Sequence, residues 1–305
     1  MRRSCLALLG CFFAASGTWA QDHPAPGTAA SVLKVVATTG AGERHGSAVV
    51  IAPDKLVTNC HVIRHAQSIH VVRGAKRWVA QHYAGDGEKD LCLLSAPGVQ
   101  APPASIGSTA NLNSGELVHA VGFPGGGTLH ASRGRVEAVY RFQGANVIQT
   151  SAPFDPGASG GGLFTAAGEL VGILTFKAPS GGAFHFAIPI DWVAPIDAAP
   201  SHRYEPAFWE RAPEQRAPFL RAVWLIAKQQ WSALFAVCEH WAINEPENGE
   251  ARLMMVQAAE RILRLPVTKV LSTADAIAGS LGELPEFRAR PFDIAQVRHL
   301  ISSQR

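Results

Sequence analysis

The sequence has little excess of charge of either sign, and beyond its start it has no long apolar run. Across its 305 residues, 27 lysines and arginines stand against 24 aspartates and glutamates, a formal net charge of +3. This balance excludes the strongly basic surface of a nucleic-acid-binding protein. A membrane-spanning helix needs about 20 consecutive apolar residues, and no segment after the first twenty residues approaches that length. We therefore expect a soluble mature protein with no nucleic-acid partner.

The first twenty residues are typical of a secretory signal peptide. Arg2 and Arg3 supply the positive start, residues 6–15 the apolar stretch, and Thr18-Trp19-Ala20 a cleavage site of small residues. We expect a signal peptide over 1–20, a flexible Pro- and Gly-containing lead-in over 21–31, and an exported protein, either periplasmic or secreted. Leu8-Leu9-Gly10-Cys11 also resembles a short lipoprotein box, so contact with a membrane is expected only if Cys11 is lipidated.

Cysteine is scarce, with five in the whole chain, and two of them would leave with the signal peptide. Cys60, Cys92 and Cys238 remain, an odd number that leaves at least one thiol unpaired in a monomer. Export to an oxidising compartment permits a disulfide between the other two.

Residues 32 to about 190 consist of short β-type runs separated by glycines. Many short strands with few helical stretches between them predict closed barrels or a sandwich, and the apolar content of 47% can fill a sizeable core. The Pro- and Ala-rich stretch 96–104 marks a seam between two such units. The predicted strands are 32–38, 46–51, 69–72, 78–83, 91–94, 117–121, 136–142, 170–176 and 183–188.

The pattern changes after Pro200. Apolar residues recur there at three-to-four spacing, which predicts amphipathic helices, and Glu245-Pro246-Glu247-Asn248 predicts a turn between two of them. Pro213-Glu214 and Pro246-Glu247 stand 33 residues apart, a hint of an internal helix-hairpin repeat.

Two short segments hold candidate catalytic residues, although each is weak evidence by itself. His61, in Thr58-Asn59-Cys60-His61-Val62, stands just past the strand-like segment Lys55-Leu56-Val57, where a lone histidine is more often structural. Asp90, in Asp90-Leu91-Cys92-Leu93-Leu94, directly precedes another, where the simple interpretation is a solvated turn.

The third segment, residues 155–163 with sequence DPGASGGGL, is more specific because its glycines have a mechanical reason. A nucleophilic serine on a tight turn needs neighbours without side chains, so that backbone N–H groups can point at the oxygen of a tetrahedral intermediate. Ser159 would be the nucleophile, and the N–H groups of Gly157 and Ser159 the oxyanion hole. The alternatives are a flexible linker and a phosphate-binding loop, but the Lys-Ser/Thr end of a P-loop is missing.

Taken together, the three segments have the order His, Asp, Ser, which resembles the trypsin-like serine proteases. TNCHV is similar to the catalytic-His segment of that family, DLCLL to its catalytic-Asp segment, and PGASGGGLF to its PGNSGGPL nucleophile loop. Residues 186–190, FAIPI, resemble the GFAIP stretch of HtrA/Deg proteases. The resemblance covers roughly residues 32–195.

The resemblance implies a mostly β fold of two six-stranded antiparallel chymotrypsin-like barrels over 32–198, followed by a helical C-terminal domain over 199–305. It also implies a serine endopeptidase with a polypeptide substrate. His61 would be the general base and acid, Asp90 would orient its imidazole, and Ser159 would form the acyl-enzyme. No metal or other cofactor is expected.

Two residues depart from the family pattern. Ala158 stands where HtrA-type proteases have Asn and digestive enzymes have an Asp that receives a new N-terminal amine, so activation by that ion pair is not expected. Pro153 stands where trypsin has an acid, which disfavours cleavage after Arg or Lys. Because the mechanism brings His61 and Asp90 together, Cys60 and Cys92 must also approach; a disulfide and two buried thiols are both open interpretations.

Nothing after Pro200 resembles the PDZ module that HtrA/Deg proteases usually carry, so sensing of peptide ends by such a module is not expected. Residues 231–251 instead resemble one tetratricopeptide-like helical pair, through which a protein partner could bind, and the simpler interpretation is a helical domain that packs on the barrels. The competing function is a noncatalytic trypsin-like scaffold that binds peptides or assembles through the helical tail.

Overall fold

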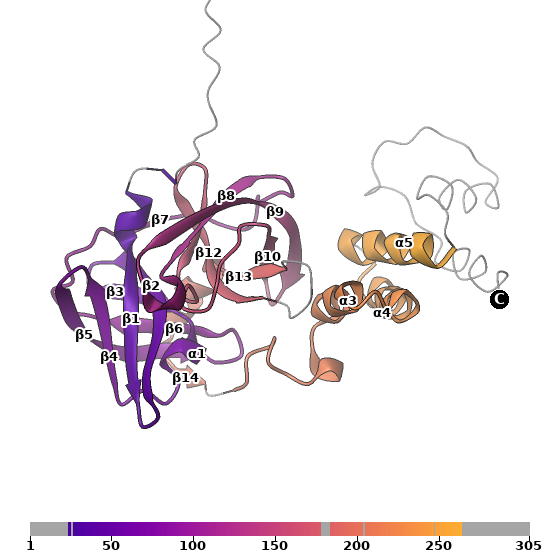
Figure 1. Cartoon of the computed structure of the whole chain (residues 1–305). Coiled ribbons are helices and arrows are strands. Elements are labelled where there is room, and N and C mark those ends of the chain that lie inside the picture. Colours follow the sequence, from indigo (N-terminus) through magenta and orange to yellow (C-terminus); the bar gives the residue numbers. More distant parts are fainter. Residues whose placement is uncertain (1–23, 26, 178–183, 204, 247, 264–305) are drawn as a thin grey trace, which may run out of the picture.

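The computed structural model describes residues 24–25, 27–177, 184–203, 205–246 and 248–263, which form two β-barrels followed by helices (Figure 1). The predicted signal peptide lies outside the described residues. Residues 28–31 of the predicted lead-in form a short 3-10 helix, Thr28–Ser31, in which Thr28 and Ser31 are buried.

The first barrel is a closed sheet of six antiparallel strands. Their order is β5-β4-β1-β2-β3-β6, and pairing of β5 with β6 closes the barrel. The two-residue strand β14 (His202–Arg203) adds to β5 in parallel. The six strands are β1 (Val32–Thr39), β2 (Gly42–Ala52), β3 (Lys55–Thr58), β4 (Ser68–Arg73), β5 (Lys76–Asp86) and β6 (Leu91–Ser95).

The second barrel repeats this plan with the order β11-β8-β9-β10-β13-β12, closed by pairing of β11 with β12. A second two-residue strand, β7 (Ser105–Ile106), adds to β12 in parallel. The predicted fold of two six-stranded antiparallel barrels is therefore confirmed. The six strands are β8 (Leu117–Gly122), β9 (His130–Phe142), β10 (Ala145–Thr150), β11 (Gly162–Thr165), β12 (Glu169–Lys177) and β13 (His185–Pro189).

Strand β1 shows why the barrels pack against each other. Successive side chains of a strand point to opposite faces. Leu33 and Val35 point into the core of the first barrel, whereas Val32 belongs to the larger apolar cluster that continues into the second barrel and the helices. Because β1 is buried on both faces, the two barrels share an apolar boundary, and polar residues at its rim are brought together.

Three helices follow the barrels, α3 (Pro218–Ala227), α4 (Trp231–Asn244) and α5 (Gly249–Leu263), and lie to one side of the second barrel (Figure 1). The predicted turn separates α4 from α5, and the Asn248 Oδ1 atom accepts a hydrogen bond from the Ala251 N–H at 3.1 Å, capping α5. Phe219 of α3 stacks on Tyr140 of β9 at 4.8 Å between ring centroids. The helices thus share a core with the second barrel. Among the described residues, no helix is long and apolar enough to span a membrane.

The remaining short elements connect these parts. They are α1 (Cys60–Ile63), α2 (Val193–Ala198) and the 3-10 helices Pro124–Gly126, Ile190–Trp192 and Pro213–Gln215.

Candidate active site

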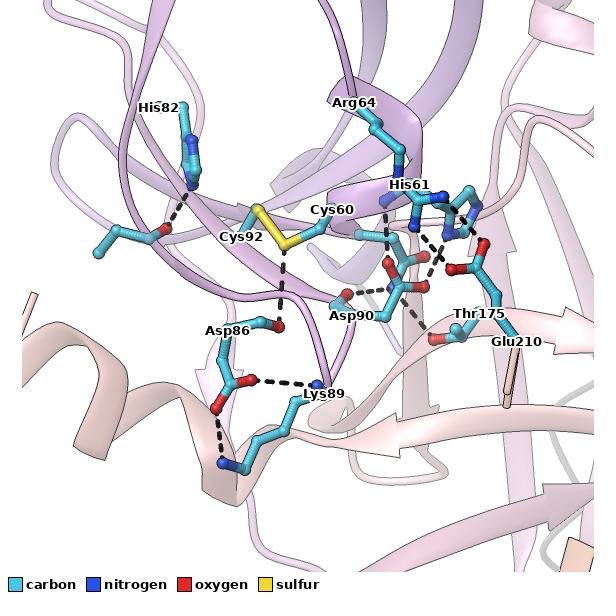
Figure 2. Close-up of a disulfide and its surroundings, with 12 residues drawn as sticks. Cys60, His61, Arg64, His82, Asp86, Lys89, Asp90, Cys92, Thr175 and Glu210 are labelled. Carbon is cyan, nitrogen blue, oxygen red and sulfur yellow. Dashed lines mark hydrogen bonds and ion pairs between the residues drawn. A yellow bond between two sulfur atoms is a disulfide. The ribbon is translucent and has the colours of Figure 1, made fainter. Parts of the chain in front are cut away.

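His61 and Asp90 come together because of the way β3 and β6 pair. The two strands are antiparallel, with Thr58 opposite Cys92, so the residues that follow β3 lie beside those that precede β6. The His61 Nδ1 atom is 2.6 Å from Asp90 Oδ2, and the His61 backbone N–H donates to Asp90 Oδ1 at 2.9 Å (Figure 2). The Asp90 side chain is fully buried, while that of His61 is 19% exposed. The imidazole therefore has one nitrogen directed at a buried carboxylate and one edge open toward the solvent.

The backbone carbonyl of Asp90 is fixed by hydrogen bonds, as its carboxylate is. The Asp90 carbonyl accepts hydrogen bonds from Asn59 Nδ2 at 3.0 Å and from the Cys60 N–H at 3.2 Å. Asn59 Nδ2 also donates to Thr175 Oγ1 at 3.1 Å. With Nδ1–H donated to Asp90, the neutral His61 ring keeps Nε2 as a proton acceptor. This is the tautomer that a general base requires.

Ser159 lies in the turn between β10 and β11, against the first barrel. Its Oγ donates to the Thr175 carbonyl at 3.2 Å, and its own carbonyl accepts from the Ser47 N–H of β2 at 2.8 Å. Gly160, with φ +85°, permits this approach, because a Cβ there would lie 2.0 Å from the Ser47 carbonyl oxygen. For Ser159 to attack a carbonyl, its hydroxyl must give up the hydrogen bond to the Thr175 carbonyl and turn toward His61, which then takes the proton. Catalytic hydrogen bonds of this kind often tighten only when substrate binds.

The turn before Ser159 presents two backbone N–H groups. Gly157 has φ +96°, in the left-handed region that favours glycine, and its carbonyl accepts from Ser47 Oγ at 2.9 Å. Within the described part of the chain, neither the Gly157 nor the Ser159 N–H donates to a protein acceptor. Two such donors beside a serine hydroxyl form the arrangement that stabilises an oxyanion.

Replacing Gly157 with alanine is expected to lower kcat about 10²- to 10³-fold, the usual cost of losing one oxyanion donor. A Cβ at this position would lie 2.7 Å from the Phe123 carbonyl oxygen and would strain the left-handed backbone, so the turn must shift. Hydrolysis of a chromogenic peptide, with folding checked by circular dichroism, measures the effect. Gly249→Ala is the matched control, because a Cβ there, at the start of α5, would meet nothing within 4 Å. Equal activity of both variants would contradict the role of Gly157.

Ala158 packs under this turn instead of forming an ion pair. It is 2% exposed and belongs to the apolar cluster of the second barrel. A cavity of about 120 Å³ adjoins it, lined in part by Gly122, Ser132 and Phe154. The turn is held from outside by Ser47 Oγ and by the Gly125 N–H, which donates to the Pro156 carbonyl at 2.7 Å. Hydrogen bonds from β2 and from residues 124–126 therefore hold the turn before Ser159. They act where an Asn or Asp at position 158 could have held the same turn from its other side.

Pro153 and Asp155 both line the same cavity. The neighbouring Asp155 is an exposed residue whose carboxylate pairs with Lys177 at 3.2 Å. Its charge is therefore directed at Lys177 near the surface.

A disulfide joins Cys60 to Cys92 (Figure 2). Cys238 is a buried free thiol. The bond connects the first residue of α1 to the second residue of β6, so it ties together the segments that carry His61 and Asp90. Burial raises the pKa of the Cys238 thiol to about 12, which keeps it protonated and poorly reactive.

Removing this disulfide, by Cys60→Ala with Cys92→Ala, is expected to lower the free energy of unfolding by about 3 to 4 kcal/mol, because the closed loop spans 32 residues. Urea unfolding with and without dithiothreitol measures it. The reductant should destabilise the native protein by a similar amount and leave the double variant unchanged. If complete reduction, verified by mass, left the free energy of unfolding of the native protein unchanged, the expectation would be contradicted.

Several residues of the site carry no signal in the sequence. Ser47 and Thr175 lie near the site only because the barrels close, and neither belongs to a recognisable motif. Asn59 stands in the His61 segment, but its hydrogen bonds to Asp90 and Thr175 have no signal in the sequence. Glu210 is also unexpected: it forms two hydrogen bonds with Arg64, at 2.7 and 3.2 Å. Burial alone would raise the pKa of Glu210, but the hydrogen bonds from Arg64 and the Ala207 N–H outweigh it and hold that pKa below its usual range. In the described segments no group of three or more His, Cys, Asp or Glu side chains is placed to hold a metal ion.

Comparison with known proteins finds relatives of the barrel segment. Residues 46–173 match the family model of the trypsin-like peptidase domain. A probable periplasmic DegP-like serine endoprotease of Pseudomonas fluorescens is 38% identical over 156 residues, which are 48% of this chain and 33% of the relative. The magnetosome formation protease MamE of Magnetospirillum gryphiswaldense is 35% identical over 167 residues, 50% of this chain and 22% of the relative. The chain thus spans a third or less of the length of these curated relatives.

The fold is also similar to that of solved protease structures. The HtrA-type protease AlgW with a bound tripeptide has a TM-score of 0.52 and 31% identity, and the match covers 56% of this chain and 60% of that one. The active form of the Rv3671c protease from M. tuberculosis has a TM-score of 0.53 and 25% identity, covering 59% of this chain and 86% of that one.

Two closed barrels with a His-Asp pair and a glycine-flanked serine at their boundary have the architecture of the chymotrypsin-like class of serine hydrolases. Within that class, residues 46–173 match the trypsin-like peptidase domain, and the barrels are similar to those of DegP-like and HtrA-type serine proteases.

Proposed function

We propose that the protein is an exported serine endopeptidase that hydrolyses polypeptides through Ser159, His61 and Asp90. The main support is the contact of His61 Nδ1 with the buried Asp90 carboxylate, beside a serine turn with two N–H groups that have no acceptor among the described residues. A buried carboxylate that accepts from both the ring and the backbone of one histidine fixes that histidine's tautomer and stabilises its cationic form.

The reaction proceeds in two halves. The Ser159 Oγ attacks the peptide carbonyl carbon while its proton passes to His61 Nε2, and the resulting oxyanion accepts hydrogen bonds from the Gly157 and Ser159 N–H groups. The C–N bond then breaks, and His61 gives the proton to the leaving amine, which leaves an acyl-enzyme. Water then attacks the ester carbon while His61 takes its proton. The C–Oγ bond breaks, His61 returns the proton to Ser159 Oγ, and the carboxylic acid product leaves.

The relatives support the substrate class and the location. The DegP-like relatives are named periplasmic serine endoproteases, and the AlgW structure contains a peptide. We therefore propose unfolded or exported polypeptides as substrates and the periplasm as the location. The domain limits proposed are 32–198 for the protease and 199–305 for the helical part. Because Pro153 carries no charge and the Asp155 carboxylate is paired with Lys177, small or medium apolar residues are the proposed cleavage preference.

A serine-reactive fluorophosphonate tests this function directly. The native protein should be labelled at Ser159, as located by peptide mass mapping, and labelling should vanish after heat denaturation because it depends on the folded site. Casein should be degraded by the same preparation. A folded protein that neither reacts with the probe nor cleaves casein would instead support the noncatalytic peptide-binding scaffold, for which Ser159, His61 and Asp90 would have no chemical role.

A further inference from the structure

A tryptophan from outside the matched protease segment borders the catalytic histidine. Trp209 belongs to the connection between the second barrel and α3, well beyond residue 173, where the family match ends. Its ring lies edge-on to the His61 ring, with centroids 5.6 Å apart and planes at 86°. The same indole stacks on Phe176 of β12 at 5.1 Å and 16°. Trp209 therefore lies between the catalytic base and a side chain of β12.

Phe176 places this contact close to the reacting atoms. It follows Thr175, whose carbonyl accepts the hydrogen bond from Ser159 Oγ. A substrate carbonyl at Ser159 would therefore have the neighbouring part of its chain beside residues 175–177 of β12. The indole of Trp209 stands over this stretch on the His61 side.

The segment that carries Trp209 is anchored on both sides of the indole. Phe208 is 1% exposed and packs against Phe142 and Phe219, and its N–H donates to the Glu88 carbonyl at 2.8 Å. On the other side, Glu210 holds Arg64, which directly follows α1 and its His61. These contacts hold the segment around Trp209 in one place, as a fixed wall beside His61. A movable lid would have few buried contacts.

Extended peptides alternate the direction of successive side chains. If the residue that supplies the attacked carbonyl points its side chain toward the second barrel near Phe154, the residue before it points toward His61 and Trp209. We propose that Trp209 is a specificity-determining residue, which admits a small side chain and excludes a large one at the substrate position preceding the residue whose carbonyl is attacked. This inference rests on the proposed endopeptidase function. In this arrangement the segment that carries Trp209, beyond the matched protease residues, completes the substrate site.

The test uses the full mature chain and fluorogenic peptides that differ only at that position, as Gly, Ala, Val, Leu or Phe. The native protein should prefer Gly and Ala. Trp209→Ala should raise kcat/KM for the Leu and Phe peptides relative to the Ala peptide by about 10-fold or more, the usual worth of matching a pocket to a large side chain. Most of the change should lie in KM. Trp209→Phe, which keeps a ring, should give an intermediate profile.

Trp231→Ala is the matched control, because it removes a partly buried tryptophan from the start of α4, where its ring lies under Arg261. Its preference profile should equal that of the native protein. An unchanged profile in folded Trp209→Ala and Trp209→Phe would overturn the inference. An equal rise for every peptide, together with faster fluorophosphonate labelling, would also overturn it, because that is the result for a blocking lid. Labelling of the native protein separates the two proposals: a labelled protein with an unchanged profile rejects only the role of Trp209, whereas an unlabelled native protein rejects the enzyme.

Discussion

Ser159→Ala is expected to reduce kcat about 10⁶-fold, to the level at which hydrolysis of casein and of peptide substrates can no longer be detected. The reason is that, in the proposed mechanism, the acyl-enzyme forms on this hydroxyl, and the members of a catalytic triad act as a unit. The change removes only one hydroxyl, which donates to the Thr175 carbonyl, so the fold should persist. Peptide hydrolysis and fluorophosphonate labelling measure the loss.

Ser114→Ala is the matched control for this change. Its hydroxyl donates to a backbone carbonyl, that of Glu137, on an exposed part of the second barrel. Activity should remain at the native level. If Ser159→Ala retained more than about a thousandth of the native rate in a preparation free of other proteases, Ser159 would not be the nucleophile.

Asp90→Asn is expected to reduce kcat about 10⁴-fold while leaving the fold intact. An amide has nearly the same shape as the carboxylate, but it offers one oxygen acceptor where Asp90 uses two, toward His61 Nδ1 and toward the His61 backbone N–H. If the amide nitrogen faces the ring, Nδ1 must become the acceptor, and Nε2 then carries a hydrogen and cannot take the serine proton. Steady-state kinetics on a chromogenic peptide measure the loss.

Asp197→Asn is the control for loss of a paired acid elsewhere. Hydrogen bonds from Lys55 and Tyr83 lower the pKa of Asp197, and these contacts lie between α2 and the first barrel. Their loss should cost stability without a comparable loss of kcat. Equal losses of kcat in Asp90→Asn and Asp197→Asn, measured on folded protein, would show that Asp90 has no special role in orienting His61.

Much of the first barrel could be predicted from local pattern, because its strands are short apolar runs bounded by turns. The second barrel was harder. Strand β10 (Ala145–Thr150) was not predicted, since Ala145, Asn146 and Gln149 break the apolar pattern; it forms because β9 and β13 pair with it on either side. The helices α3 to α5 were predicted from their spacing, yet their docking through Phe219 onto Tyr140 has no local signal.

The candidate site divides in the same way. His61, Asp90, Ser159 and Gly157 belong to short motifs, whose residue types suit acyl transfer and whose order along the chain resembles that of the trypsin-like family, and so they can be identified as candidates in the sequence. Ser47 and Thr175 lie far from those motifs in the chain and support the turn only through barrel closure.

The sequence by itself indicated closed barrels or a sandwich, the candidate residues His61, Asp90 and Ser159 and the helical C-terminal region, because strand length, helical spacing and the glycine-flanked serine are properties of neighbouring residues. The two-barrel class followed from the resemblance of its motifs to the trypsin-like proteases. Only the tertiary structure decided which distant groups meet. It placed Ser47 against the turn that carries Gly157 and Ser159, and it joined Cys60 to Cys92. It also set Trp209 against His61. Such contacts depend on how two barrels and a connecting segment pack in space, and the free energy of that packing is summed over many residues rather than held in any one motif.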